Sequence, residues 1–188
     1  MTEPAPPAEP ATPEPDAKDW TWTLERPCPE CGFDAADVDR DDLAGRVTAT
    51  NVAWRAILER PDVAERPDDT TWSPLEYGCH VRDVHRVYAG RIGRMLTEDD
   101  PHYDNWDQDA TAIEEGYREQ DPVTVSAELS ASGEELGAIL AGVDGDAWQR
   151  TGRRGDGAIF TVDSIGRYYL HDIEHHIWDV TGALPTRP

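Results

Sequence analysis

Two histidines four positions apart, His171 and His175, offer the clearest potential for chemistry in this sequence. On a helix their side chains lie one turn apart on one face, roughly 6 Å apart at Cβ, so both imidazoles can bind one metal ion. The alternative is a pair of core histidines satisfied by hydrogen bonds alone. A metal would satisfy one nitrogen of each ring while the other nitrogen reaches an acceptor. His176 is rotated by about 100° from His175, so we do not expect it to join the pair.

A third ligand has to come from another helix, and three histidines are available: His80, His85 and His102. Helical periodicity favours His80 slightly, because it lies at the edge of the apolar stripe that carries Tyr77 and Val84. His85 borders the other side of that stripe, and His102 falls in a polar connection. The spacing alone therefore leaves the third ligand open.

The segment Cys28-Pro29-Glu30-Cys31-Gly32 resembles half of a zinc-ribbon knuckle. Structural zinc normally takes four ligands, and Cys79 is the only other cysteine of the chain. We expect free thiols. A second metal site with Cys28, Cys31 and Cys79 is one alternative, and a redox pair is another. Three cysteines cannot all pair within one chain, so we do not expect a disulfide scaffold.

Apolar residues spaced by threes and fours predict the helices that carry these residues. A long helix is expected to start at Pro74, because Ser73 suits the N-cap and Glu76 stands three residues after it. The expected helices are about residues 43–60, 74–96, 122–143 and 162–180, with a short one at 110–118. Residues 152–157 are expected to form a loop rich in glycine and arginine. No alternation of period two is long enough to predict a sheet, so the predicted class is all-α, a four-helix bundle with a crossover connection.

Composition divides the chain into three parts. Residues 1–18 are rich in proline, alanine and acidic residues and are expected to be a disordered tail. Residues 19–36 form an N-terminal segment that contains the two close cysteines, and residues 37–188 form the helical bundle. A chain of 188 residues is long enough for one domain with a proper core.

The charge balance argues against nucleic acid as a partner. The chain has 39 acidic and 17 basic residues, a formal net charge of -22, which would repel a phosphate backbone. No apolar run approaches the roughly 18 residues of a membrane span, and the N-terminus lacks the pattern of a signal peptide. We therefore expect a cytoplasmic protein without a membrane partner, present as a monomer or homodimer.

Two segments resemble the motif regions of the DinB/YfiT-like metalloenzymes. The first is residues 72–76 with His80 and Asp83, and the second is residues 169–176. The resemblance covers most of residues 37–181. In that superfamily one histidine of the second helix and an HxxxH pair of the last helix bind a divalent metal. The resemblance therefore implies His80, His171 and His175 as ligands, with Asp83 and Asp179 behind them.

The superfamily includes mycothiol-dependent maleylpyruvate isomerase and bacillithiol S-transferases, so the resemblance implies thiol chemistry. Three imidazoles leave coordination positions open, as in catalytic sites. The implied protein is a metal-dependent thiol S-transferase or isomerase-like enzyme that binds a low-molecular-weight thiol such as mycothiol and an electrophilic substrate. Zinc is the expected ion, with nickel or iron as alternatives, because imidazole suits all three. The runner-up is a non-catalytic metal- or small-molecule-binding stress-related protein, followed by a purely structural bundle.

Overall fold

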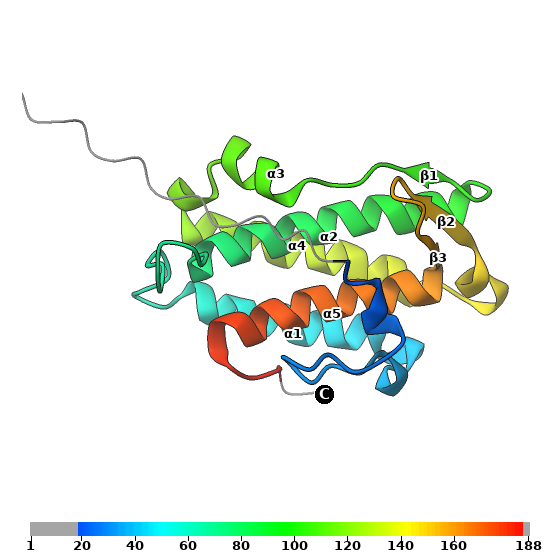
Figure 1. The fold of residues 1–188 in the computed structure, drawn as a ribbon, viewed down its shortest axis with the longest axis horizontal. Helices are drawn as coiled ribbons and strands as arrows, with labels where there is room; N and C mark the ends of the chain where they lie inside the picture. The colour runs from blue at the N-terminus through cyan, green and yellow to red at the C-terminus, as the bar shows by residue number, and fades with distance from the viewer. Residues whose placement is uncertain (1–18, 186–188) are drawn as a thin grey trace, which may run out of the picture.

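The computed structural model describes residues 19–185, and the predicted disorder of residues 1–18 lies outside the described residues. Four long α-helices run side by side (Figure 1). They are α1 (Leu43–Leu58), α2 (Pro74–Thr97), α4 (Pro122–Ala141) and α5 (Val162–Thr181). The four long helices predicted from the sequence are thus confirmed to within a few residues at each end. No helix among residues 19–185 is both long and apolar enough to cross a membrane.

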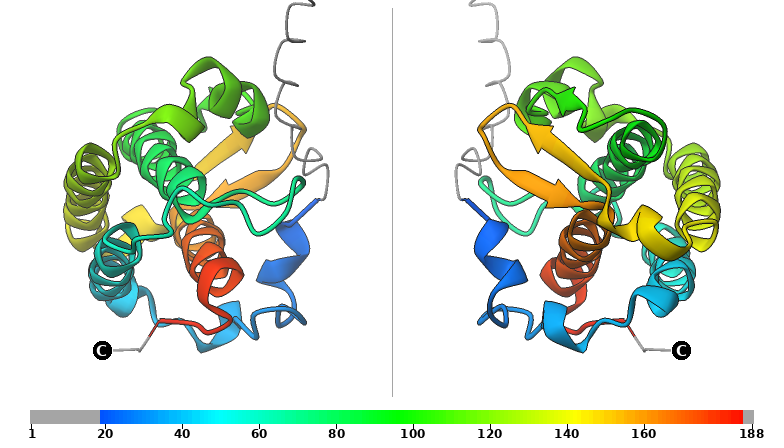
Figure 2. Two further views of the ribbon diagram at one scale, coloured as in Figure 1. Left: turned by 90° about the vertical axis from the view of Figure 1, so that its left-hand side faces the viewer. Right: turned by 90° about the vertical axis from the view of Figure 1, so that its right-hand side faces the viewer.

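The helices form a bundle in which α1 and α2 each pack against both α4 and α5. The end-on views of Figure 2 show the same arrangement, with α4 and α5 on opposite sides of the ring. The helices α1 and α2 follow one another in sequence but lie diagonally opposite, so the connection between them crosses the end of the bundle. This confirms the predicted four-helix bundle with a crossover.

Local signals start the two helices that carry the candidate ligands. Ser73 and Glu76 form a capping box at the start of α2, in which the Ser73 hydroxyl accepts from the Glu76 backbone N–H and the Glu76 carboxylate accepts from that of Ser73. Thr161 caps α5 in the same way, and Gly182 ends that helix at a φ of 73°. These caps set where the ligands fall along each helix.

The core between the helices is mostly apolar but also contains buried charged side chains. Its fully buried side chains include Trp54, Leu75, Ile92, Leu129, Leu136 and Ile165. Arg46 of α1 and Glu174 of α5 form a buried ion pair inside this core. The pair joins α5, the helix that carries most of the candidate ligands, to its neighbour α1.

A small sheet departs from the all-α expectation. It has the order β1 (His102–Tyr103), β2 (Thr151–Arg154) and β3 (Ile159–Thr161), with β1 parallel to β2 and β2 antiparallel to β3. The predicted loop at 152–157 is instead a strand and a turn with Gly157 at a φ of 94°. Strands of two to four residues are too short to show a period of two, which is why the sequence analysis missed them.

Two further segments surround the bundle. The predicted helix at 110–118 is a helix α3 (Gln108–Glu114) followed by a short 3₁₀ turn, Tyr117–Glu119. The N-terminal segment, from Trp20 to Val38, packs on α5 and includes the 3₁₀ turns Thr21–Leu24 and Ala35–Asp37. In Figure 2 this blue segment lies on the side of α5 away from α4. The outer face of α5 is therefore covered by chain more than a hundred residues earlier in the sequence.

Candidate metal centres

The helix α5 carries two pairs of candidate ligands on two faces. His171 and His175 turn toward the N-terminal segment, whereas Asp172 and His176 turn toward α2. Both pairs have a spacing of four residues, and they are offset by one residue, which rotates one pair by about 100° relative to the other. Two clusters result: His80 with Asp172 and His176, and Cys28 and Cys31 with His171 and His175.

The first cluster lies between α2 and α5. One ligand atom each from His80, Asp172 and His176 lies within 4.8 Å of the other two. The Asp172 carboxylate lies 3.6 Å from Nε2 of His80 and 3.1 Å from Nε2 of His176. The two imidazole rings are 4.7 Å apart between centroids and nearly perpendicular. Two imidazoles and one carboxylate thus converge on one point.

His80 is fully buried, and neither ring nitrogen has a hydrogen-bond partner among the described residues. Trp106 stacks on the ring at 5.4 Å, and Trp72 packs against it at 5.5 Å. Burial lowers the pKa of His80, which favours the neutral ring, whose unprotonated nitrogen is available to a metal. Buried polar atoms without partners are rare in folded proteins. A bound ion at this point would satisfy one of the two nitrogens, and the other would carry the proton of the neutral ring.

Carboxylates hold His176 in place from both sides. Its Nδ1 lies 2.8 Å from Oδ2 of Asp179, and its Nε2 faces Asp172. Burial disfavours the charged ring, but the hydrogen bonds that His176 donates to Asp172 and Asp179 outweigh it and raise the pKa of His176 to about 9. The metal-free cluster therefore holds a proton that a metal ion would displace. A carboxylate behind a ligating histidine is a regular feature of metal sites.

A pocket of about 520 Å³ opens beside this cluster. Asp172 and His176 line it, as do His171 and His175, and aromatic rings form much of its wall: Trp20, Tyr88, Trp106 and Tyr168. Two cations, Arg91 and Arg154, also line it. The Arg91 guanidinium donates to the backbone oxygen of Asp104, and that of Arg154 pairs with Asp156. The pocket thus combines aromatic rings with charged side chains of both signs, since Asp107, Asp109 and Asp156 line it as well.

The structure does not bring the three predicted ligands together. His80 lies with Asp172 and His176, because His171 and His175 point about 100° away from α2. The other two histidines considered as third ligands lie elsewhere: His85 pairs with the Tyr169 hydroxyl at 2.7 Å, and His102 is exposed on β1. Asp172 and His176 were not predicted as ligands from the sequence, although their four-residue spacing matches that of His171 and His175.

The two carboxylates expected behind the ligands have different surroundings. Asp179 lies 3.5 Å from Nε2 of His175 and also bonds His176, so it touches both clusters. Asp83 instead accepts hydrogen bonds from Arg82, Arg86 and the Tyr117 hydroxyl. Its carboxylate belongs to an ion-pair network in which Arg82 and Arg86 also contact Glu128 of α4.

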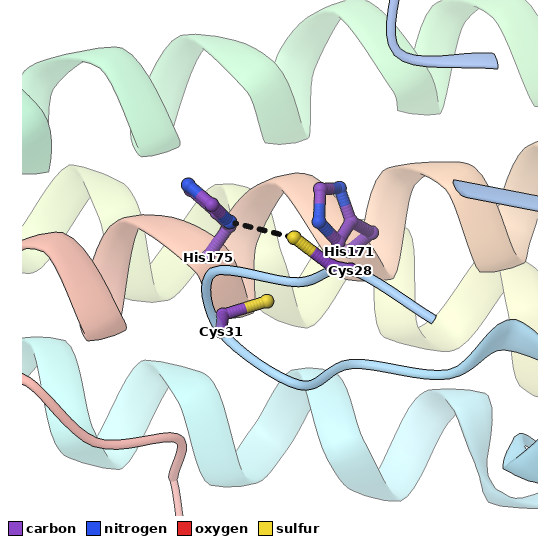
Figure 3. A group of neighbouring side chains, drawn as sticks. All are labelled: Cys28, Cys31, His171 and His175. Atoms are coloured by element: carbon purple, nitrogen blue, oxygen red, sulfur yellow. Dashed lines mark hydrogen bonds between the residues drawn. The ribbon is translucent and has the colours of Figure 1, made fainter. Parts of the chain in front are cut away.

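The second cluster contains two of the three cysteines. Cys28 and Cys31 are buried free thiols beside His171 and His175, with one ligand atom from each residue within 4.8 Å of the others (Figure 3). Burial raises the pKa of Cys31 to about 12 and lowers that of His171 to about 4. Cys79 is not part of this group, since its sulfur faces the Tyr117 carbonyl and the Gln120 side chain.

A helical bundle with a crossover and a ligand cluster between its second and last long helices defines the class of this protein. The chain belongs to the DinB superfamily, whose family model matches residues 46–180. A solved relative is YfiT from Bacillus subtilis, a probable metal-dependent hydrolase with an unusual four-helix bundle topology. It is 20% identical with a TM-score of 0.71, over 76% of this chain and 84% of that one. A search of curated proteins found no match.

Proposed function

We propose that this protein is a divalent-metal-dependent enzyme whose ion is held by His80, Asp172 and His176. The observation that carries the proposal is the fully buried His80, whose two ring nitrogens have no hydrogen-bond partner among residues 19–185. Asp172 and His176 offer the other two ligand atoms, and Asp179 orients the His176 ring. These residues replace the three-histidine set expected from the sequence.

The donor set suits a catalytic ion. Two histidines and one carboxylate form three-ligand sites that leave positions open, with zinc in hydrolytic enzymes and with iron in oxygenases. When bound, such an ion lowers the pKa of a thiol or water that joins it. Trp106 and Trp72 cover the His80 side of the cluster, so the open side is the one that Asp172 and His176 present to the pocket.

The pocket supports transfer of a thiol to an electrophile as the reaction. About 520 Å³ is room for a low-molecular-weight thiol together with a second small molecule. Arg91 and Arg154 can bind the carboxylates that such compounds carry, and Tyr88 and Tyr168 can pack on their apolar parts. In the reaction the thiol sulfur bonds to the electrophilic carbon, the leaving group departs with its electron pair, and the thiol proton passes to solvent. Mycothiol is the first thiol to test.

Hydrolysis is the second candidate. The solved relative YfiT is described as a probable metal-dependent hydrolase, and water is the alternative nucleophile for the same centre. The two reactions can be told apart by the added thiol, which the transfer needs and hydrolysis does not. The same purified protein can therefore be tested for both.

The experiment measures metal content and turnover in the full chain after reconstitution with Zn²⁺, Ni²⁺ or Fe²⁺. His80→Asn and His176→Asn should each lose the same single ion and keep the helical circular dichroism of the wild type. His102→Asn, which changes an exposed histidine, is the matched control and should lose nothing. If His80→Asn and His171→Asn each lose one ion and the double variant loses no more than either, the three-histidine set is supported instead.

Turnover is measured as consumption of an aryl halide with mycothiol, and of an activated ester without it. Thiol-dependent consumption that disappears in His80→Asn supports the transferase. Ester cleavage that disappears in the same variant supports the hydrolase. If the protein binds the ion at His80 but consumes neither substrate with any of the three metals, the proposed function changes from an enzyme to a metal-binding protein.

A further inference from the structure

The second cluster joins parts of the chain that are far apart in sequence. Cys28 and Cys31 come from the N-terminal segment, and His171 and His175 come from α5. All four side chains are buried, with exposed fractions of 1%, 9%, 4% and 7%. We propose that they form a structural zinc site that fastens the N-terminal segment to the last helix, separate from the ion at His80.

The cysteine loop already has the shape of a zinc knuckle. The Gly32 N–H donates to the Cys28 carbonyl at 2.9 Å, and the Cys28 N–H donates to the Phe33 carbonyl at 2.8 Å. The Phe33 N–H points at the Cys31 sulfur at 3.4 Å. Gly32 has a φ of 76°, which a side chain would strain. This tight turn presents both sulfurs to the same side, toward the imidazoles (Figure 3).

The two histidines complete the ligand set. Nδ1 of His175 lies 3.8 Å from the Cys28 sulfur, and Nε2 of His171 is buried without a hydrogen-bond partner among the described residues. The other nitrogen of His175, Nε2, lies 3.3 Å from the Glu30 carboxylate and 3.5 Å from that of Asp179. These carboxylates fix the ring so that Nδ1 faces the sulfurs, as carboxylates do behind zinc-bound histidines.

The donor set indicates zinc and a structural role. Two thiolates and two imidazoles are the ligands of closed tetrahedral zinc sites, and four protein ligands leave no position for a substrate. Phe33 and Trp20 pack against the His171 ring at 5.2 and 5.6 Å between centroids and shield it further. The cluster at His80 has no sulfur and only three ligands. The two sites therefore differ in both chemistry and coordination.

The zinc site would also shape the pocket. Trp20 precedes the cysteine loop, packs on both His171 and His175, and forms part of the pocket wall. The helical bundle has its own apolar core, so the binding energy of the zinc would order the N-terminal segment rather than the whole fold. The ion would thus hold one wall of the pocket in place.

Cobalt distinguishes the two sites directly. In Co²⁺-reconstituted wild type we expect near-ultraviolet absorption from charge transfer between thiolate and cobalt, because only this site contains sulfur. The band should vanish in the double variant Cys28→Ser/Cys31→Ser, which should also lose one equivalent of zinc. His80→Asn should keep the band. Cys79→Ser, which alters an equally buried thiol outside the cluster, is the matched control and should keep it too.

Limited proteolysis tests whether the zinc ion fastens the N-terminal segment to α5. Phe33 is fully buried, so the zinc-loaded protein should resist chymotrypsin after this residue, and chelation should expose it. The proposed zinc site would be overturned if the Co²⁺-reconstituted wild type lacked the charge-transfer band. It would also be overturned if the double variant kept its zinc content. Protection that does not change on chelation would overturn its fastening role. If the double variant does not fold, the cobalt spectrum of the wild type and that of His175→Asn decide the matter.

Discussion

Replacing Arg46 by alanine is expected to lower the free energy of unfolding by about 3–5 kcal/mol, because it removes the guanidinium that pairs with a buried carboxylate. Arg46 donates to both carboxylate oxygens of Glu174, from Nε to Oε1 at 2.9 Å and from Nη2 to Oε2 at 2.6 Å. The two side chains are only 5% and 4% exposed. Water cannot replace the lost partner, so we expect the cost of a buried pair rather than the small value of a surface pair.

For a domain of this size a loss of about 3–5 kcal/mol corresponds to a melting temperature lower by roughly 6–20 °C. Two variants serve as controls. Arg46→Met combined with Glu174→Leu removes both charges and should recover most of the lost stability, since apolar residues can replace a buried ion pair. Arg94→Ala breaks a two-point pair with Glu98 that is nearly half exposed, and it should leave the melting temperature within error.

The assay is chemical denaturation followed by circular dichroism, with all variants saturated with zinc so that metal binding does not contribute to the differences. A loss below about 1 kcal/mol in Arg46→Ala, the range of an exposed pair, would refute the argument. So would a double variant as unstable as Arg46→Ala, because the cost would then come from lost packing and not from the stranded carboxylate.

Two further predictions concern α4 and α2. Gly133→Ala should cost about 1–3 kcal/mol, because its Cβ would fall 2.4 Å from the side-chain amide of the buried Asn51. Gly137→Ala, one turn later, has room and should be neutral or stabilising by up to about 1 kcal/mol, as urea midpoints would show. Burial raises the pKa of Asp83, but hydrogen bonds from Arg82 and a tyrosine outweigh it and hold this pKa below its ordinary value. The stability that the Asp83 carboxylate contributes is thus present above pH about 4 and lost as the pH falls through the folded-state pKa. Asp83→Asn should therefore be less stable than wild type at pH 7, and the gap should narrow in acid; a gap that stays constant to pH 2 would contradict this.

The long helices could be predicted because their signals are local. The capping box of Ser73 and Glu76, the apolar spacing along each helix and the stop at Gly182 all act within a few residues. The small sheet could not be predicted in this way. Its strands are too short to show a pattern, and β1 pairs with β2 across about fifty residues of chain.

The candidate site was predicted only in its parts. The sequence correctly indicated that His80 lies on the second long helix and that the last long helix carries a close group of histidines. It did not show the partners of each histidine. His171 and His175 share one spacing, Asp172 and His176 share the same spacing one residue later, and nothing local tells which pair faces α2.

The sequence by itself therefore determined the long helices, their approximate ends and the close group of histidines on the last of them. Only the tertiary structure decided how those side chains are grouped. The physical reason is that a periodic pattern specifies which residues share a face of a helix, but the orientation of that face depends on packing against distant elements. Cys28 and His175 are 147 residues apart and meet only because the N-terminal segment covers the outer face of α5. That contact places one pair of candidate ligands on α5 beside the cysteines and the other pair beside His80, and both pairs line the pocket.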